Sequence, residues 1–314
     1  MNPVRFLMPA QQSKTVARSC LLAGVALTAA LFGCNSTTPE GDTTTLRIGA
    51  IPDQNPEKLN RLYDTLSDEL SDQLDVPVRY VPVSNYAAAV TAFRSGSLDL
   101  VWFGGLTGVQ ARLQTPGSQV LAQRDIDAEF TSVFIANGAS GLKPITSTDQ
   151  LVQLKGKRFA FGSESSTSGR LMPQYFMKQN GISPDDFAGG RPGFSGSHDA
   201  TIAVVQSGAY EAGALNSQVW DSHVEDGRID PEKVSEIWRT PTYADYHWVA
   251  AAKLDQRFGE GFTNRLQEAL IGIEPDTERR RTILDVFGAE AFIPAADGDY
   301  VAIEAVGREL GKIR

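Results

Sequence analysis

Cysteine is almost absent from this 314-residue sequence, in which it occurs only at positions 20 and 34. Position 34 is a candidate for acylation, as argued below, so a mature chain that begins there would have no free thiol. Such a chain can have no disulfide, thiolate metal site or cysteine nucleophile. Only three histidines are present, and no two of them have the HxxxH spacing, which argues against a metal site. We therefore expect neither a metal nor another cofactor.

Positive charge is also in short supply. The chain has 29 Lys and Arg residues against 38 Asp and Glu residues, which gives a formal net charge of -9. Nucleic acid is therefore not an expected partner. Because the net charge repels anions, any anion site in this chain has to rely on local hydrogen-bond donors.

The amino-terminal segment does not have a long enough apolar run to span a bilayer comfortably. Its apolar stretch covers residues 20–30 and follows three basic residues and no acidic one, which predicts a secretory signal sequence over residues 1–33. Residues 31–34 resemble a bacterial lipobox, which implies a lipid on Cys34 and a membrane-anchored protein in the periplasm or cell envelope. A soluble periplasmic protein cut nearby is the alternative. Residues 34–45 are polar and are expected to form a flexible tether.

The remainder of the chain alternates strand patterns with amphipathic helix patterns. Strands are expected at 46–51, 77–83, 98–103 and 131–136, and helices after Asn55-Pro56, after Ser84-Asn85 and, late in the chain, at 262–271, 277–287 and 300–310. This alternation is typical of βαβ units with a mainly parallel sheet, so the predicted fold class is α/β.

Two segments have the pattern of crossings between two lobes. They are Asn137–Gly141 and Ile237–Tyr243, with hinges expected near Asn137–Gly141 and Thr240–Tyr243. We predict that residues 46–138 and 243–314 form the first lobe and that residues 139–242 form the second. Two interleaved lobes of this kind leave a cleft for a ligand between them.

A serine-rich turn, Gly162–Gly169, follows the apolar strand pattern at residues 158–161 and precedes a helix pattern that starts at Arg170. A turn between the end of a strand and the start of a helix has free backbone N–H groups and the positive end of the helix dipole. Its small hydroxyl side chains add further donors, so the turn suits a tetrahedral oxyanion. An ordinary serine or threonine helix cap is the alternative.

Two parts of the sequence share a similar pattern at a constant offset of 112 residues. The segment from Asn85 to Gly104 and the segment from Ser197 to Asn216 each contain a polar turn, an Ala/Val-rich helix, a Ser-Gly stop and a strand. The matched helix starts carry Tyr86 and His198. If each copy belongs to one lobe, these two side chains can face each other across the cleft, although two unrelated βα units can also look alike by chance.

Four short blocks, taken together, resemble the phosphonate-type solute-binding proteins of bacterial ABC importers. The blocks are Asn85–Ala87, Asp99–Gly104, Ser166–Gly169 and Phe194–Asp199. The resemblance implies a type II periplasmic-binding-protein fold, a small oxyanion ligand such as phosphite, a phosphonate or phosphate, and ABC permease and ATPase subunits as partners of a monomeric binding protein. The segments Trp102–Gly105 and Asp245–Trp248 look closer to a branch labelled as selenate binders, so a selenate or sulfate ligand is the alternative.

The resemblance also implies which residues bind the ligand. Hydroxyl and N–H donors from the serine turn, a histidine from the next helix start and a tyrosine from the other lobe would contact the oxyanion; these are Ser166, Thr167, Ser168, His198 and Tyr86. Phe103 departs from the family pattern, because a tyrosine is common at its position, and its ring would make the pocket more apolar. Asp245 is the expected acceptor for a ligand amine or P–OH group.

Two further classes of function compete with transport. Ser168, His198 and Asp199 could suggest a hydrolase triad. However, the sequence contains no Gly-x-Ser-x-Gly elbow, and His198 and Asp199 are adjacent, so one can hardly orient the other. We therefore expect no enzyme activity. The other alternative is a lipoprotein sensor that passes its ligand state to a membrane receptor.

Overall fold

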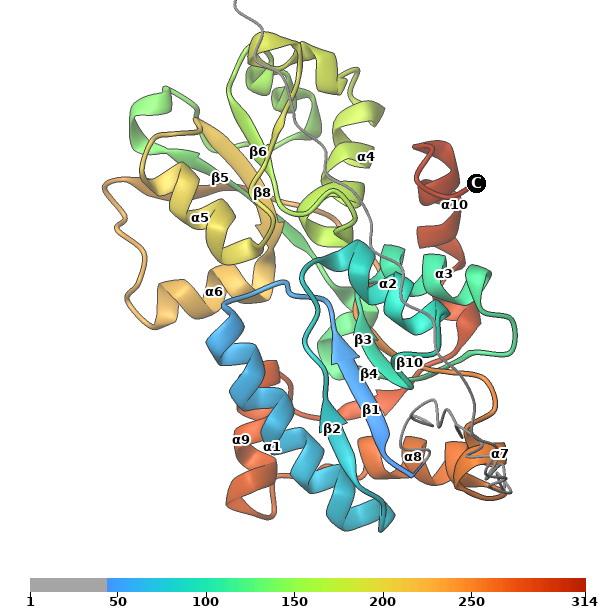
Figure 1. Cartoon of the computed structure of the whole chain (residues 1–314). Helices are drawn as coiled ribbons and strands as arrows, with labels where there is room; N and C mark the ends of the chain where they lie inside the picture. The colour runs from blue at the N-terminus through green and yellow to red at the C-terminus, as the bar shows by residue number, and fades with distance from the viewer. Residues whose placement is uncertain (1–43) are drawn as a thin grey trace, which may run out of the picture. The chain divides into compact units, whose positions relative to one another are not determined.

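The computed structural model describes residues 44–314 (Figure 1). The predicted signal sequence at 1–33, the predicted lipidation site at Cys34 and nearly all of the predicted tether lie outside the described residues. No helix among the described residues is long and apolar enough to cross a membrane.

The first lobe contains a six-stranded sheet with the strand order β11-β4-β10-β3-β1-β2. Its strands are β1 (Leu46–Ala50), β2 (Val78–Tyr80), β3 (Leu100–Phe103), β4 (Gln119–Arg124), β10 (His247–Ala250) and β11 (Phe292–Pro294). β1 is parallel to both β2 and β3, as the βα alternation predicted, whereas β10 returns from the second lobe and lies antiparallel between β3 and β4.

Seven helices belong to the first lobe in the described part of the chain. They are α1 (Pro56–Leu74), α2 (Tyr86–Arg94), α3 (Gly105–Gln114), α7 (Leu254–Phe258), α8 (Phe262–Ile271), α9 (Glu278–Phe287) and α10 (Val301–Glu309). Helices α1 and α9 cover one face of the sheet, and α2 and α3 cover the other (Figure 1). The three helices predicted late in the chain are therefore confirmed as α8, α9 and α10.

The second lobe contains a five-stranded sheet with the strand order β7-β6-β8-β5-β9. Its strands are β5 (Ser132–Asn137), β6 (Phe159–Phe161), β7 (Gly193–Phe194), β8 (Ala212–Asn216) and β9 (Val234–Arg239), and its α-helices are α4 (Met172–Gln179), α5 (His198–Gln206) and α6 (Ser217–Glu225). The side chains of α5 and α6 pack on one face of this sheet, and Met177 of α4 packs on the other.

Local sequence explains where the helices that reach the cleft begin. The Asn55 side chain accepts hydrogen bonds from the backbone N–H groups of Glu57 and Lys58 at the start of α1, and Pro56 occupies the first helical position. The Asn85 side chain accepts from Ala88 N–H at the start of α2. Each asparagine lies in the loop that follows a strand, so each cap determines where the next helix begins and the chain reverses its direction along the sheet.

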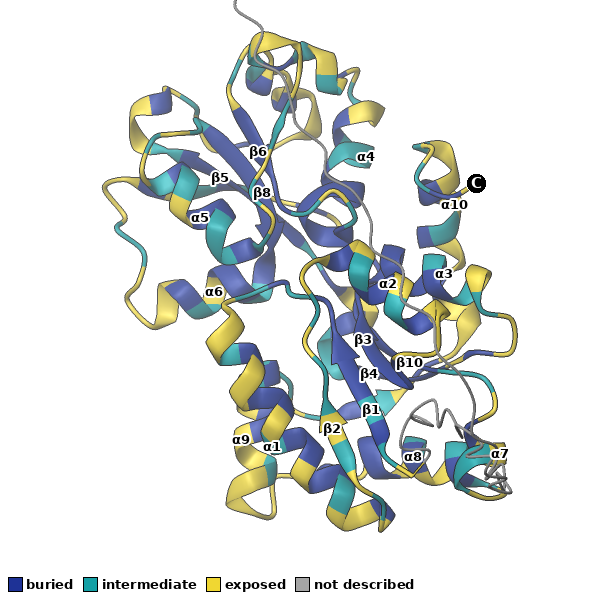
Figure 2. Ribbon diagram, in the orientation of Figure 1, coloured by how far each residue is buried: buried dark blue, intermediate teal, exposed yellow. Residues whose placement is uncertain are grey.

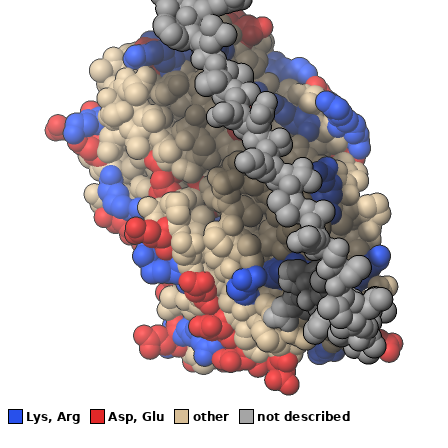
Figure 3. Space-filling model, viewed as in Figure 1, with Lys and Arg blue, Asp and Glu red and all other residues tan. Residues whose placement is uncertain are grey.

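The core of the first lobe is aromatic where β3 and β10 meet α9. Trp102 of β3 and Trp248 of β10 have ring centroids 5.2 Å apart, and Phe287 packs edge-on against Trp102 at 5.3 Å. Figure 2 shows both sheets as buried throughout their centres, with exposed residues on the outer helix faces. On the surface, charges of both signs are interspersed (Figure 3), and Arg280 of α9 contacts Glu69 of α1 at 2.6 Å.

The crossings between the sheets differ from the sequence prediction. The second crossing is shorter than expected, because residues 237–239 belong to β9 of the second sheet. β5 was assigned to the first lobe, but it pairs with β8 and β9 of the second sheet. The first crossing therefore precedes Ser132 and does not lie at Asn137–Gly141. At the crossing, Phe130 and Tyr243 exchange backbone hydrogen bonds of 2.8 and 2.9 Å, so the two connecting segments run side by side.

Candidate functional site

The serine turn folds as a single π-helical turn, Thr167–Leu171, between β6 and α4. Ser166 is a helix cap, since its side chain accepts a 2.9 Å hydrogen bond from Gly169 N–H. For Ser166, the alternative interpretation as an ordinary helix cap is therefore correct. A side chain at position 169 would come within 3.0 Å of Ser166 Oγ and 3.2 Å of His198 Cε1, so glycine allows the turn to pack closely on α5. Ser166, Thr167 and Ser168 are all buried.

Three of the predicted site residues carry a buried polar atom that has no hydrogen-bond partner in the described part of the chain. These atoms are Tyr86 OH, Ser168 Oγ and Asp245 Oδ2. Tyr86 and Asp245 belong to the first lobe and Ser168 to the second. Since buried polar groups are normally hydrogen-bonded, three such atoms on predicted site residues indicate a site for a polar ligand. The tyrosine and serine hydroxyls can donate, and a carboxylate oxygen can accept.

Asp245 is held at the start of α3. Its Oδ1 accepts a 2.9 Å hydrogen bond from Gly105 N–H. The next N–H of this helix, that of Leu106, donates to Thr167 Oγ1 of the second lobe at 2.9 Å. The amino terminus of α3 is therefore capped by a side chain from each lobe. Burial raises the pKa of Asp245 to about 7, even though the Gly105 N–H group acts in the opposite direction.

His198, the first residue of α5, is fully buried, and both of its ring nitrogens have protein partners. Nδ1 accepts from Asn216 N–H at 3.3 Å, which leaves Nε2 as the protonated nitrogen, and Nε2 donates to Tyr246 OH at 3.1 Å. Burial lowers the pKa of His198 to about 4, so the ring is neutral at pH 7. The expected bond to an oxyanion thus has a competing partner in Tyr246.

The hydroxyl of Tyr246 connects the lobes through two bonds. It accepts from His198 Nε2 and, at 3.0 Å, from Asn216 Nδ2, and both of these residues belong to the second lobe. The backbone adds a third connection, because His198 N–H donates to Asp53 O at 2.9 Å. Burial raises the pKa of the Asp53 carboxyl to about 6. Sequence analysis missed Asp53, Asn216 and Tyr246, whose roles depend on contacts between distant segments.

Phe103 lies in the core of the first lobe. Its ring is fully buried and packs edge-on against Phe93 of α2, with ring centroids 5.7 Å apart. The neighbouring residue in β3, Trp102, points to the opposite face and stacks on Tyr246 at 5.7 Å. Trp102 therefore supports the tyrosine that joins the lobes.

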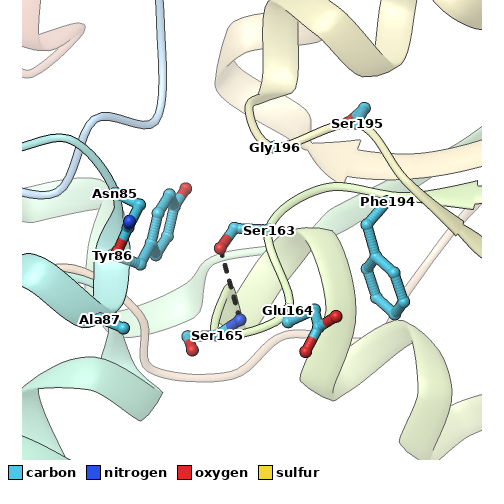
Figure 4. Close-up of a pocket in the computed structure, with 9 residues that line it drawn as sticks. All are labelled: Asn85, Tyr86, Ala87, Ser163, Glu164, Ser165, Phe194, Ser195 and Gly196. Carbon is cyan, nitrogen blue, oxygen red and sulfur yellow. Dashed lines mark hydrogen bonds between the residues drawn. The ribbon is translucent and has the colours of Figure 1, made fainter. Parts of the chain in front are cut away.

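An open groove of about 350 Å³ adjoins the buried cluster (Figure 4). It is lined by the start of α2, by the serine turn and by the segment before α5, namely Asn85, Tyr86, Ala87, Ser163, Glu164, Ser165, Phe194, Ser195 and Gly196. Tyr86 belongs both to this groove and to the cluster of unpaired atoms. The groove therefore marks where the two lobes meet next to the candidate site.

Ser168, His198 and Asp199 do not form a hydrogen-bonded catalytic triad. His198 bonds Tyr246 and Asn216, whereas Asp199 is paired with His223 at 3.0 Å. Ser168 Oγ has no hydrogen bond to either histidine. Within residues 44–314, no group of three His, Cys, Asp or Glu residues could hold a metal ion. The candidate site residues instead supply two neutral hydroxyl donors, those of Tyr86 and Ser168, and one carboxyl group, that of Asp245, which can accept a proton.

A family model described as "ABC transporter, phosphonate, periplasmic substrate-binding protein" matches residues 48–300. The chain belongs to this family. It is therefore the periplasmic substrate-binding component of an ABC transporter, and the expected type II periplasmic-binding-protein fold is confirmed.

Similar proteins include one with an assigned ligand. The chain is 52% identical over 284 residues to the probable ABC transporter phosphite binding protein PhnD1 of Prochlorococcus marinus (strain MIT 9301), covering 90% of this chain and 96% of the relative. The solved structure of PhnD1 in complex with methylphosphonate has 53% identity and a TM-score of 0.85, covering 87% of this chain and all of that one. The phosphate-import protein PhnD of Mycolicibacterium smegmatis is 28% identical over 223 residues, 67% of each protein.

Proposed function

We propose that this protein captures phosphite or a small alkylphosphonate such as methylphosphonate and delivers it to the ABC permease. The observation that carries the proposal is the set of three unpaired buried atoms, Tyr86 OH, Ser168 Oγ and Asp245 Oδ2. The similarity to PhnD1, whose structure contains methylphosphonate, supports the same ligand class.

The hydrogen-bonding character of these atoms determines which anions fit. Tyr86 and Ser168 donate to ligand oxygens, whereas an ionised Asp245 can only accept. A phosphonate or phosphite monoanion carries a P–OH group that can donate to Asp245. Sulfate and selenate are fully ionised at neutral pH and can only accept, so they would face the carboxylate with no proton between them. The site should therefore prefer protonated phosphorus oxyanions.

The donors of the proposed site come from both lobes, so capture should require closure. Tyr86 and Asp245 approach the ligand from the first lobe, and Ser168, the remaining serine-turn N–H groups and His198 approach it from the second. We propose that the lobes rotate about hinges near Phe130–Thr131 and Thr240–Tyr243, and that the ligand shifts the population toward the closed arrangement.

Other features of the proposal concern the whole protein. We propose that Cys34 carries a lipid that anchors a monomeric protein to the membrane, and that the bound ligand is not chemically altered. Incubation of the protein with phosphate and carboxyl esters should therefore give no turnover.

Calorimetry of the domain from residue 35 onward tests the choice of ligand. The panel is phosphite, methylphosphonate, 2-aminoethylphosphonate, phosphate, sulfate and selenate. Phosphite or methylphosphonate should bind most tightly. Tight binding of sulfate or selenate without a response to phosphite and the phosphonates would refute the ligand choice. Small-angle scattering with the tightest ligand should show a decrease in radius of gyration, and no decrease would contradict closure.

A further inference from the structure

A chain of buried hydroxyl groups joins the two crossing segments to the serine turn. Ser132 is the first residue of β5, directly after the first crossing, and Tyr243 lies in the second crossing. The Tyr243 hydroxyl lies 2.6 Å from Ser132 Oγ, and Ser132 Oγ donates to the Ser168 carbonyl oxygen at 2.7 Å. Ser132 is fully buried, so water does not compete for these bonds.

The chain of hydrogen bonds from Tyr243 OH through Ser132 Oγ to Ser168 O is called the relay below, and the donor and acceptor of each of its bonds follow from their chemistry. A carbonyl oxygen can only accept, so the single proton of the Ser132 hydroxyl is committed to Ser168 O. The short contact with Tyr243 therefore requires the tyrosine to donate. Tyr243 then has no proton left for a ligand, which distinguishes it from Tyr86, whose hydroxyl makes no hydrogen bond of 3.5 Å or shorter within residues 44–314.

The relay also relates two unpaired atoms that belong to different lobes. Ser168 provides Oγ, and Asp245, two residues after Tyr243, provides Oδ2. Tyr243 is further fixed by its backbone pairing with Phe130, which ties the two crossing segments together. The hydroxyls of Tyr243 and Ser132 therefore fix the serine turn relative to the strand segment that carries Asp245.

We propose that Ser132 is a positioning residue, which acts through Ser168 to set the spacing between the Ser168 donor and the Asp245 acceptor. This inference rests on the proposed function, because it treats Ser168 and Asp245 as ligand-binding groups. It goes further in assigning a role in ligand recognition to a hinge-side residue that does not itself touch the ligand.

A double-mutant cycle tests the relay in the domain from residue 35 onward. Calorimetry compares Ser132→Ala, Ser168→Ala and their combination, using methylphosphonate, phosphite and sulfate as probes and analysing whichever the wild type binds most tightly. Ser132→Ala leaves the Ser168 carbonyl and the Tyr243 hydroxyl unpaired, so its affinity should fall by on the order of 10-fold. Because Ser132 acts through Ser168, the combined loss should be at least about 3-fold smaller than the product of the single losses.

Two controls separate this role from a general effect on folding. Ser132→Ala combined with Tyr86→Phe, a donor on the other lobe, should lose affinity by the product of the single losses. Ser67→Ala removes another buried serine hydroxyl, which donates to the Tyr63 carbonyl at 2.6 Å within α1 and not to the serine turn, and should leave affinity unchanged. If Ser132→Ala does not fold, Tyr243→Phe replaces it, with an expected loss of about 2- to 5-fold that is again not multiplicative with Ser168→Ala.

Several outcomes would overturn the inference. They are unchanged affinity in Ser132→Ala, losses that multiply with Ser168→Ala as they do with Tyr86→Phe, or an equal loss in Ser67→Ala. The proposed function would fail in a different way, through a wild-type preference for sulfate, and the cycle could still be measured with that anion.

Discussion

Replacing Asp245 by asparagine should stabilise the protein at alkaline pH. Burial raises the pKa of this carboxyl from 3.8 to about 7, a difference of about 3 units. At 1.36 kcal/mol per unit, a charged Asp245 costs the folded state up to about 4 kcal/mol. Asparagine removes the charge, and its side-chain oxygen can still accept from Gly105 N–H.

The pH dependence of this effect follows from the sign of the shift. An acid whose pKa is raised by folding does not penalise the folded state below its unfolded pKa of 3.8. The penalty grows between pH 3.8 and about 7 and is complete above that range. The unfolding midpoints of wild type and Asp245→Asn, measured without ligand, should therefore agree at pH 4 and diverge toward pH 8, with the variant higher.

Asp186→Asn provides a matched control with the opposite sign. Its partly exposed carboxylate caps a short turn, and the hydrogen bond from Ser183 N–H lowers the pKa of Asp186. Loss of that carboxylate should slightly lower the midpoint at pH 8 and have no effect at low pH. If the difference between Asp245→Asn and wild type is the same at pH 4 and pH 8, or if the variant is less stable at pH 8, the argument about Asp245 is wrong.

The same substitution should change which anions bind. The amide introduced by Asp245→Asn would offer an N–H donor where the wild type has only an acceptor, so a fully ionised anion would no longer meet a carboxylate. We expect sulfate affinity to rise at least about 10-fold and the preference for methylphosphonate to narrow, as measured by calorimetry at pH 8. A variant that still rejects sulfate would show that Asp245 does not control selectivity.

Three other substitutions test separate parts of the proposal. Ser168→Ala should weaken methylphosphonate binding by about 5- to 150-fold, the cost of a missing buried donor, and leave the ligand-free melting temperature nearly unchanged; normal binding would show that the turn is only a helix cap. Tyr246→Phe removes the shared acceptor of His198 and Asn216, so scattering should show a larger radius of gyration with ligand than in wild type, and an unchanged radius would contradict this role. Cys34→Ser should move the protein to the soluble fraction, and material that still pellets with membranes at high salt would rule out the proposed anchor.

Much of the fold could be predicted from local patterns. Asn55-Pro56 and Asn85 mark helix starts whose caps depend only on neighbouring residues. The strand–turn–helix order around Gly162–Gly169 also follows from short-range signals, because the turn residues and the apolar runs are contiguous. These signals correctly placed the serine turn at the end of a buried strand.

The position of the first crossing could not be predicted in this way. Residues 132–137 are an apolar strand, which has the same sequence pattern whichever sheet it joins. Its partners, β8 and β9, are about 80 to 100 residues away in the chain, and no local feature identifies them. Local signals therefore favour a crossing at the glycine-containing turn after the strand over one between Thr131 and Ser132.

The residues that join the lobes were missed for a similar reason. Tyr246 stood next to Asp245 in a segment already singled out, but its value depends on two donors, His198 and Asn216, that reach it only when the sheets are assembled. Asp53 contributes to the same contact through its backbone carbonyl, which no side-chain pattern reveals. His198 was expected beside the ligand, and whether it also contacts the ligand stays a prediction.

The contacts between the lobes include hydrogen bonds to Tyr246 OH, Thr167 Oγ1 and Asp53 O, each of which water can replace when the lobes separate. Leu171 and Met172 of the second lobe also pack on the core of the first. Methylphosphonate has only five non-hydrogen atoms, and at a ceiling of about 1.5 kcal/mol per atom it can contribute at most about 7 kcal/mol to binding. Any free energy spent on bringing the lobes together is subtracted from that small total. That ceiling corresponds to a Kd of about several micromolar, so capture near this limit is possible only if the open and closed arrangements are nearly equal in free energy before the ligand arrives.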